Sequence, residues 1–173
     1  ELPHGEIGEL IVRGEVVSRE YATRRDANPI AKIDDGNSVW HRMGDVGYFD
    51  DQHRFWFCGR MAHRVQTVAG TMFSVPCEEI FNQHPSVYRS ALVGAGQGNI
   101  KRPVIVVEPW PEHRPRCRNR RRQLLEELRS LAQRHKLTRS ITDFLMIRNM
   151  PVDVRHNAKI RREDLEAWAS RRI

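Results

Sequence analysis

The sequence predicts an α+β protein in which a small C-terminal domain, with a β-hairpin and a three-stranded sheet flanked by helices, follows a set of β-strands. Two observations lead to this fold class. β-Branched and aromatic runs separated by turn residues fill the first 60 positions, and helical and strand periods alternate after residue 75. Only 39% of the 173 residues are hydrophobic, but they come in blocks, so a core can still form.

In the first part of the chain, the expected elements are strands. Residues 8–14 are a short β-branched run between glycines, whereas residues 24–38 are polar and irregular. Aromatic runs at 46–49 and 55–58 flank an acidic turn at 50–53. Because aspartate favours turns, this pattern predicts a hairpin.

The second part of the chain is expected to begin with another hairpin and a helix. Residues 65–68 and 72–75 would pair, with the chain turning at 69–71. Pro76 suits the first position of a helix, because no hydrogen-bonding N–H is needed there, and Pro85 would end the element.

The remaining elements are expected to complete the sheet and its helical cover. Apolar runs indicate buried strands, and leucines spaced by four and three residues indicate a long helix. A final short helix would carry Leu165 and Trp168 on one face. The strands are expected at 90–94, 104–107 and 144–147, and the helices at 118–135 and 163–171.

Composition narrows the class of protein. The formal net charge of +7 permits anionic partners such as ATP or nucleic acid but does not choose between them. The arginine run at 114–122 lacks interleaved aromatic residues, so it indicates a solvated loop rather than a nucleic-acid site. Three scattered cysteines without a C-x-x-C motif, and the lack of a membrane-spanning run, favour a reduced cytoplasmic protein. Because the chain opens without methionine, we expect a piece of a longer protein.

Three side chains are candidates for handling a nucleotide. Asp45 lies between Gly44 and Gly47, where a carboxylate can accept hydrogen bonds from a ribose diol. Arg60 has a planar fork that suits ribose or phosphate oxygens. Lys159 is a point charge able to contact a carboxylate and a phosphate together. Taken alone, each has an ordinary explanation as a turn aspartate, a strand-end arginine or a solvated lysine, and for Asp45 and Arg60 that explanation is the stronger one.

As an ordered set, however, the motifs resemble the last third of the adenylate-forming enzymes, which include acyl-CoA synthetases, peptide-synthetase adenylation domains and firefly-type luciferases. The resemblance covers nearly the whole chain. Within this superfamily, segments 58–65, 75–78 and 155–159 look like the olefin-biosynthesis β-lactone synthetases, which adenylate a 2-alkyl-3-hydroxy fatty acid and close it to a β-lactone. The superfamily motifs are GEIGEL at 5–10, WHRMGDVGY at 40–48, Gly59-Arg60, PCEEI at 76–80 and NAKIRR at 157–162.

The resemblance implies a role for each candidate. Asp45 would hold the ribose hydroxyls of ATP, and Arg60 would reach the ribose from the junction of two domains. Lys159 would bridge the acyl carboxylate and the α-phosphate. Residues 1–59 would be the tail of a large N-terminal domain, and residues 60–173 a small mobile domain whose rotation carries Lys159 into and out of the site.

The chain departs from the family pattern at Ala158 and in the spacing before Gly70, and the spacing bears on the product. Ala158 stands where the family has a glycine before the lysine. One extra residue separates Gly59-Arg60 from Gly70, and in thioester-forming relatives the glycine that matches Gly70 lines the pantetheine tunnel. The altered spacing disfavours use of coenzyme A and favours the β-lactone interpretation.

The leading hypothesis is the C-terminal part of an AMP-forming ligase of fatty acid metabolism that uses ATP and Mg²⁺. Its substrate would be a long-chain 2-alkyl-3-hydroxy acid, and other enzymes of the same olefin-forming pathway are possible partners. One alternative is a fatty acyl-CoA or acyl-carrier-protein ligase, and another is a basic module that binds nucleic acid or protein. The family's phosphate loop, magnesium ligand and acyl pocket are missing from this chain, so we expect no metal site in it and no activity from it alone.

Overall fold

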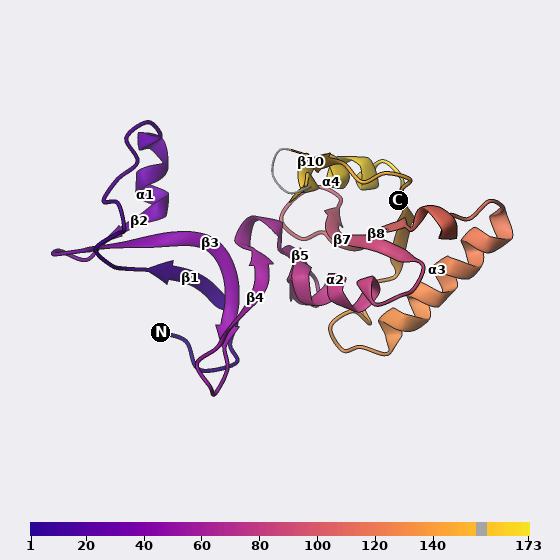
Figure 1. Ribbon diagram of the computed structural model, residues 1–173, viewed down its shortest axis with the longest axis horizontal. Helices are drawn as coiled ribbons and strands as arrows, with labels where there is room; N and C mark the ends of the chain where they lie inside the picture. The colour runs from indigo at the N-terminus through magenta and orange to yellow at the C-terminus, as the bar shows by residue number, and fades with distance from the viewer. Residues whose placement is uncertain (155–158) are drawn as a thin grey trace. The chain divides into compact units, whose positions relative to one another are not determined.

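The computed structural model describes residues 1–154 and 159–173 and divides into two compact units, Glu1–Ala62 and His63–Ile173 (Figure 1). The division falls within the 3₁₀ turn η2, Met61–His63, shortly after the boundary expected between residues 59 and 60. None of the helices in the described part of the chain combines the length and the hydropathy needed to cross a membrane.

The first unit is built around the long strand β3, which pairs antiparallel with three other strands. The expectation of irregular structure over 24–38 is wrong, because this segment forms a 3₁₀ turn, a helical turn and an edge strand. Pairing with β3 creates that strand, and local sequence does not specify such a contact. The elements are β1 (Gly8–Val12), η1 (Arg25–Ala27), α1 (Asn28–Ala31), β2 (Lys32–Asp34), β3 (Val39–Phe49) and β4 (Phe55–Arg60).

The hairpin expected between the two aromatic runs is confirmed as β3 and β4. The Asp50 carboxylate accepts hydrogen bonds from the backbone N–H groups of Gln52 and Arg54, at 2.9 and 3.0 Å. His53 has a φ of +58°, in the left-handed region that a tight turn often requires. The closed turn fixes the register of the hairpin, in which Arg60 falls opposite Asp45.

The second unit confirms the predicted α+β architecture. Strands β7 and β8 are antiparallel, and β9 joins β8 in parallel after the chain crosses over through α3. A separate hairpin, β5 and β6, comes before α2, the first helix of this unit. The elements are β5 (Val65–Thr67), β6 (Gly70–Met72), α2 (Ser74–Asn82), β7 (Val87–Ala95), β8 (Arg102–Pro109), η3 (Pro111–His113), α3 (Arg118–Gln133), β9 (Asp143–Met146), β10 (Val152–Asp153), β11 (Lys159–Ile160) and α4 (Arg162–Ser170).

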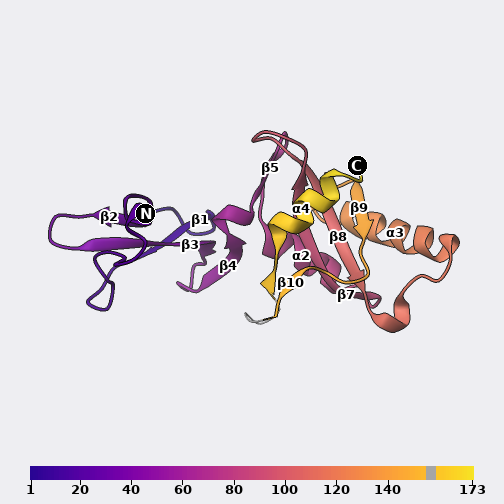
Figure 2. The ribbon, with the colours of Figure 1, turned by 90° about the horizontal axis from the view of Figure 1, so that it is seen from above.

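The three-stranded sheet has a core on each face, as the views in Figures 1 and 2 allow the reader to follow. Leu92 and Ile105 pack with α2 and α3 on one face. Their chain neighbours Val93 and Val106 pack with α4 on the other. This alternation is the two-residue period of a strand that is buried on both sides. The sheet therefore holds α2 and α4 on opposite faces of one rigid layer.

Several element boundaries differ from the sequence-based expectation. Helix α2 begins at Ser74 rather than Pro76, so the proline lies within the first turn, where it costs no helical hydrogen bond. The second hairpin turns at residues 68–69 rather than 69–71, and the Thr67 hydroxyl closes it by donating to the Gly70 carbonyl at 2.8 Å. His135, expected at the end of the long helix, lies beyond α3 and is exposed.

Candidate functional site

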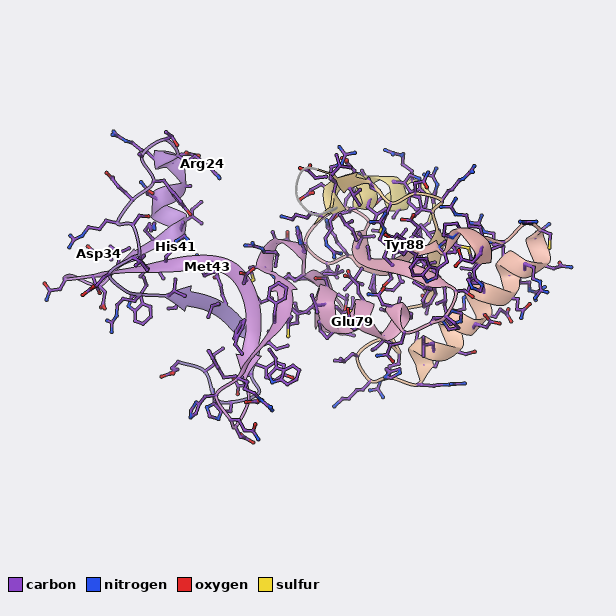
Figure 3. All side chains as sticks on the ribbon, viewed as in Figure 1. Arg24, Asp34, His41, Met43, Glu79 and Tyr88 are labelled. Atoms are coloured by element: carbon purple, nitrogen blue, oxygen red, sulfur yellow. The ribbon has the colours of Figure 1, made fainter. Side chains whose placement is uncertain are left out.

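Asp45 and Arg60 lie opposite each other on β3 and β4. Arg60 Nε is 2.9 Å from Asp45 Oδ1, and Arg60 Nη1 donates a hydrogen bond to the Met43 carbonyl at 2.9 Å. Met43 is labelled on the first unit in Figure 3. The structure thus brings together two of the residues that the sequence singles out and attaches the arginine to the backbone just before the aspartate.

The surrounding backbone supports this geometry. Val46 and Cys58 are buried next to the pair and anchor the two strands. Gly44 has a φ of +70°, which allows the backbone to turn directly before Asp45. A bulge in the ladder between Val46 and Gly47 locally changes the strand register. The turn and the bulge together direct the Asp45 carboxylate toward Arg60.

The pair remains accessible to a ligand. The Asp45 side chain is 21% exposed and the Arg60 side chain 47% exposed. A carboxylate has about four acceptor positions and a guanidinium five donors, so one mutual contact leaves capacity for further hydrogen bonds. This donor and acceptor set fits the hydroxyls and ring oxygen of a ribose.

Lys159 is the first residue of β11 and is exposed. Its strand pairs with β10, where Lys159 lies opposite Asp153, while the next residue, Ile160, packs against the core beneath α4. Alternation along the strand therefore turns the Lys159 side chain away from that core. Among the described residues, its ammonium group has no hydrogen bond or ion pair. The motif residues Arg155, His156, Asn157 and Ala158 lie outside the described residues.

A buried ion pair lies close to Lys159 in sequence and was not expected. Arg162, the first residue of α4, contacts both carboxylate oxygens of Glu78 on α2, at 2.6 and 2.9 Å. Burial raises the pKa of Glu78 above its usual range, while Arg162 and the backbone N–H of Leu92 act in the opposite direction. This pair was missed from the sequence, although helical spacing from Cys77 and Phe81 puts Glu78 on the buried face of α2.

Gly70 opens β6 with a φ of +120°, a conformation that L-residues rarely adopt. It is exposed, and a Cβ added there would meet no atom within 4 Å. The positive φ is therefore sufficient reason for a glycine at position 70, and no contact with a ligand is needed to account for it.

The other features singled out in the sequence lie on the surface or in the core. Cys58 and Cys77 are buried, and burial raises the pKa of Cys58, so these thiols are poor nucleophiles. The arginines at the start of α3 are exposed, and Arg122 pairs with Glu126 one turn later. Within the described residues, no three His, Cys, Asp or Glu side chains cluster as a metal site would require.

The fold and the ordered motifs define a class of protein. No family model matches the chain. Its structure is similar to the amide bond synthetase McbA from Marinactinospora thermotolerans, with a TM-score of 0.77, 23% identity and coverage of 96% of this chain and 32% of that one. It is also similar to o-succinylbenzoate CoA synthetase from Bacillus subtilis, solved with an acyl-adenylate, with a TM-score of 0.75, 22% identity and coverage of 95% and 31%. At these identities the two likenesses show the fold of the chain.

Sequence identity is higher to a second set of relatives. The chain is 43% identical to the olefin beta-lactone synthetase of Xanthomonas campestris, over 98% of this chain and 31% of that protein. It is 42% identical to the olefin beta-lactone synthetase of Stenotrophomonas maltophilia, over 96% of this chain and 30% of that protein. The 4-chlorobenzoate–CoA ligase of an Arthrobacter species is 35% identical over 61% of this chain and 20% of its own length. The two olefin beta-lactone synthetases show that the chain belongs to the adenylate-forming superfamily. The chain spans about a third of the length of these two proteins.

Proposed function

We propose that the full-length protein is an ATP-dependent, AMP-forming ligase that converts a long-chain 2-alkyl-3-hydroxy acid to a β-lactone through an acyl-adenylate. The observation that carries this proposal is the 43% identity with an olefin beta-lactone synthetase over nearly the whole chain. The Asp45–Arg60 pair and the exposed Lys159 support it, because their chemistry fits a ribose and a reacting carboxylate.

In the proposed first step, the Asp45 carboxylate accepts hydrogen bonds from the ribose hydroxyls, and Arg60 holds that carboxylate in place while donating to the sugar. The Lys159 ammonium donates to the acyl carboxylate and to the α-phosphate. A carboxylate oxygen bonds to the α-phosphorus as the bond to pyrophosphate breaks. Lys159 aligns the two anionic groups and offsets the charge that develops between them.

In the proposed second step, the 3-hydroxyl oxygen of the acyl group attacks the acyl carbon. The hydroxyl proton passes to water, the four-membered lactone closes, and the bond between the acyl carbon and the phosphate oxygen breaks as AMP leaves. Mg²⁺ would neutralise phosphate charge during adenylation, and we propose that its protein ligand lies outside this chain. We further propose that residues 1–59 end a large domain and that residues 60–173 form a small mobile one, which brings Lys159 to the adenylation site.

The central test is Lys159→Ala in the full-length protein, measured as substrate-dependent exchange of pyrophosphate into ATP. Loss of one such electrostatic contact is expected to slow exchange by about 10²–10³-fold while ATP still binds. Lys136→Ala is the matched control, because Lys136 is also an exposed lysine of the second unit. Exchange at the wild-type rate in Lys159→Ala would refute the assignment.

Product analysis tests the proposed chemistry separately. The full-length protein is incubated with ATP and a long-chain 2-alkyl-3-hydroxy acid, with and without coenzyme A. A lactone that forms without thiol is the expected product. An acyl thioester, with consumption of thiol, would replace the lactone proposal by a thioester-forming ligase and leave the adenylation step intact.

A further inference from the structure

The ion pair between Glu78 and Arg162 is buried and has the geometry of a fork. The Arg162 nitrogens Nη1 and Nη2 contact Oε1 and Oε2 of Glu78 at 2.6 and 2.9 Å, and the two side chains are only 15% and 10% exposed. Parallel contacts of this kind fix both distance and orientation, which a single contact does not. The pair thus defines the position of the first residue of α4 relative to α2.

Leu92 on β7 completes the network. Its backbone N–H donates to Glu78 Oε1 at 2.7 Å, and its carbonyl accepts from Arg162 Nη1 at 3.1 Å. The neighbouring Ser90 hydroxyl donates to the Glu78 carbonyl at 3.1 Å. Two helices and the edge of the sheet are therefore joined at one point, and both charged groups have several partners.

The location of this network distinguishes it from an ordinary stabilising contact. Replacing a buried ion pair with apolar side chains is often neutral or stabilising, so net stability alone is a weak reason for having one. Here the arginine follows Lys159 by three positions, at the junction between β11 and α4. The same junction is held by a second contact, in which the Arg161 N–H donates to the Pro151 carbonyl at 2.9 Å.

We propose that Glu78 and Arg162 are positioning residues that hold the strand–helix junction carrying Lys159, so that its ammonium group is presented in one fixed orientation. This inference rests on the proposed function of Lys159. Lys159 itself is exposed on a two-residue strand, and such a strand is too short to define its own orientation. The rigid sheet and α2 supply the orientation through Arg162, which does not itself need to touch the substrate.

The test uses Glu78→Gln and Arg162→Lys in the full-length protein, with pyrophosphate exchange as the readout. The first change removes the charge, and the second keeps the charge but removes the fork. Because a shift of about 1 Å in a catalytic group can cost on the order of 100-fold, kcat is expected to fall about 10- to 100-fold. KM for ATP should stay within about twofold, since the ribose-binding residues proposed above belong to the other unit. Glu79→Gln, an exposed neighbour on α2 that Figure 3 labels, is the matched control and should behave as wild type.

A double-mutant comparison tells a positioning role from a merely structural one. If Glu78 acts through Lys159, adding Glu78→Gln to Lys159→Ala should cost no further activity. The inference would be overturned if Glu78→Gln lowered the activity of the Lys159→Ala protein by the same factor as that of the wild type. It would also be overturned by a wild-type kcat in either single variant that folds. Thermal unfolding of each variant shows whether it folds. If Glu78→Gln does not fold, Arg162→Lys still provides the test. If Lys159→Ala is inactive but Glu78→Gln is fully active, only the positioning inference fails; a fully active Lys159→Ala overturns both proposals.

Discussion

Arg60 and Asp45 form a cross-strand ion pair, with Arg60 Nε 2.9 Å from Asp45 Oδ1, and Arg60 is also bonded to the Met43 carbonyl. The arginine therefore contacts the backbone on one side of Gly44 and the aspartate on the other. Such an arrangement orients the carboxylate before any ligand arrives, and preorganised hydrogen-bonding groups lose little freedom on binding.

The first prediction concerns Asp45→Ala in the full-length protein. A hydrogen bond to a charged group contributes about 1.5–3 kcal/mol, so the Kd for ATP measured by isothermal titration calorimetry should rise by roughly 10- to 100-fold. Asp51→Ala is the control, since Asp51 is a nearly fully exposed residue in the turn of the same hairpin. An unchanged Kd in Asp45→Ala would remove Asp45 from the nucleotide site.

The second prediction concerns Gly44→Ala. The added Cβ would be 3.8 Å from Arg60 Nη1, an ordinary contact, so the cost comes from the φ of +70°. Forcing an L-residue into the left-handed region should destabilise the first unit by about 1–2 kcal/mol, measured as a lower Tm of the full-length protein. Gly14→Ala is the control, because Gly14 has no positive φ and open space around it. Equal melting of the two variants would contradict the strained-turn explanation.

The sequence predicts well the elements that are long enough to show a repeated hydrophobic pattern. Both hairpins, the three strands of the sheet and α3 carry repeated hydrophobic patterns, and they lie within a few residues of their expected positions. The sequence predicts no strand at the positions of β10 and β11, because two residues are too few to show a period. Strand β2 exists through its pairing with β3, which local sequence does not encode.

The candidate site was predicted only in part, because its contacts also depend on pairing between segments that are distant in the sequence. Motif order singles out Asp45 and Arg60 as candidates, but their direct contact depends on a hairpin register that includes a bulge. Glu78 lies in a helix that the sequence predicts, but its partner Arg162 is 84 residues later in the chain. Contacts between such distant residues follow from packing of the whole unit, which a local pattern does not reveal.

The third prediction concerns the pH dependence of the β3–β4 hairpin. The indole N–H of Trp56 donates to the Asp50 carboxylate at 2.8 Å, and with the Arg54 backbone N–H it holds the pKa of Asp50 well below the usual value of 3.8. Because the folded pKa is depressed, the carboxylate stabilises the hairpin above the ordinary aspartate range. That stabilisation is lost as pH falls through the folded pKa.

An NMR titration of the Asp50 carboxyl carbon tests this relationship. The midpoint should lie below the usual value in the wild type and move upward in Trp56→Phe, which removes the largest cause of the shift. The same midpoint in both proteins would show that the indole does not determine the titration. Asp50→Asn identifies the signal, because it removes this titrating group and leaves the other carboxylates in place.

The last prediction concerns the crossover helix α3, which covers one face of the sheet. Leu128 is fully buried within the core that α3 shares with α2, and removing its side chain leaves a cavity that the rigid sheet is poorly able to fill. Leu128→Ala should therefore destabilise the second unit by about 2–5 kcal/mol, measured by denaturant unfolding. Leu137→Ala, at a leucine that is 57% exposed just beyond α3, should cost much less. A similar cost for the two substitutions would mean that Leu128 is not part of a tightly packed core.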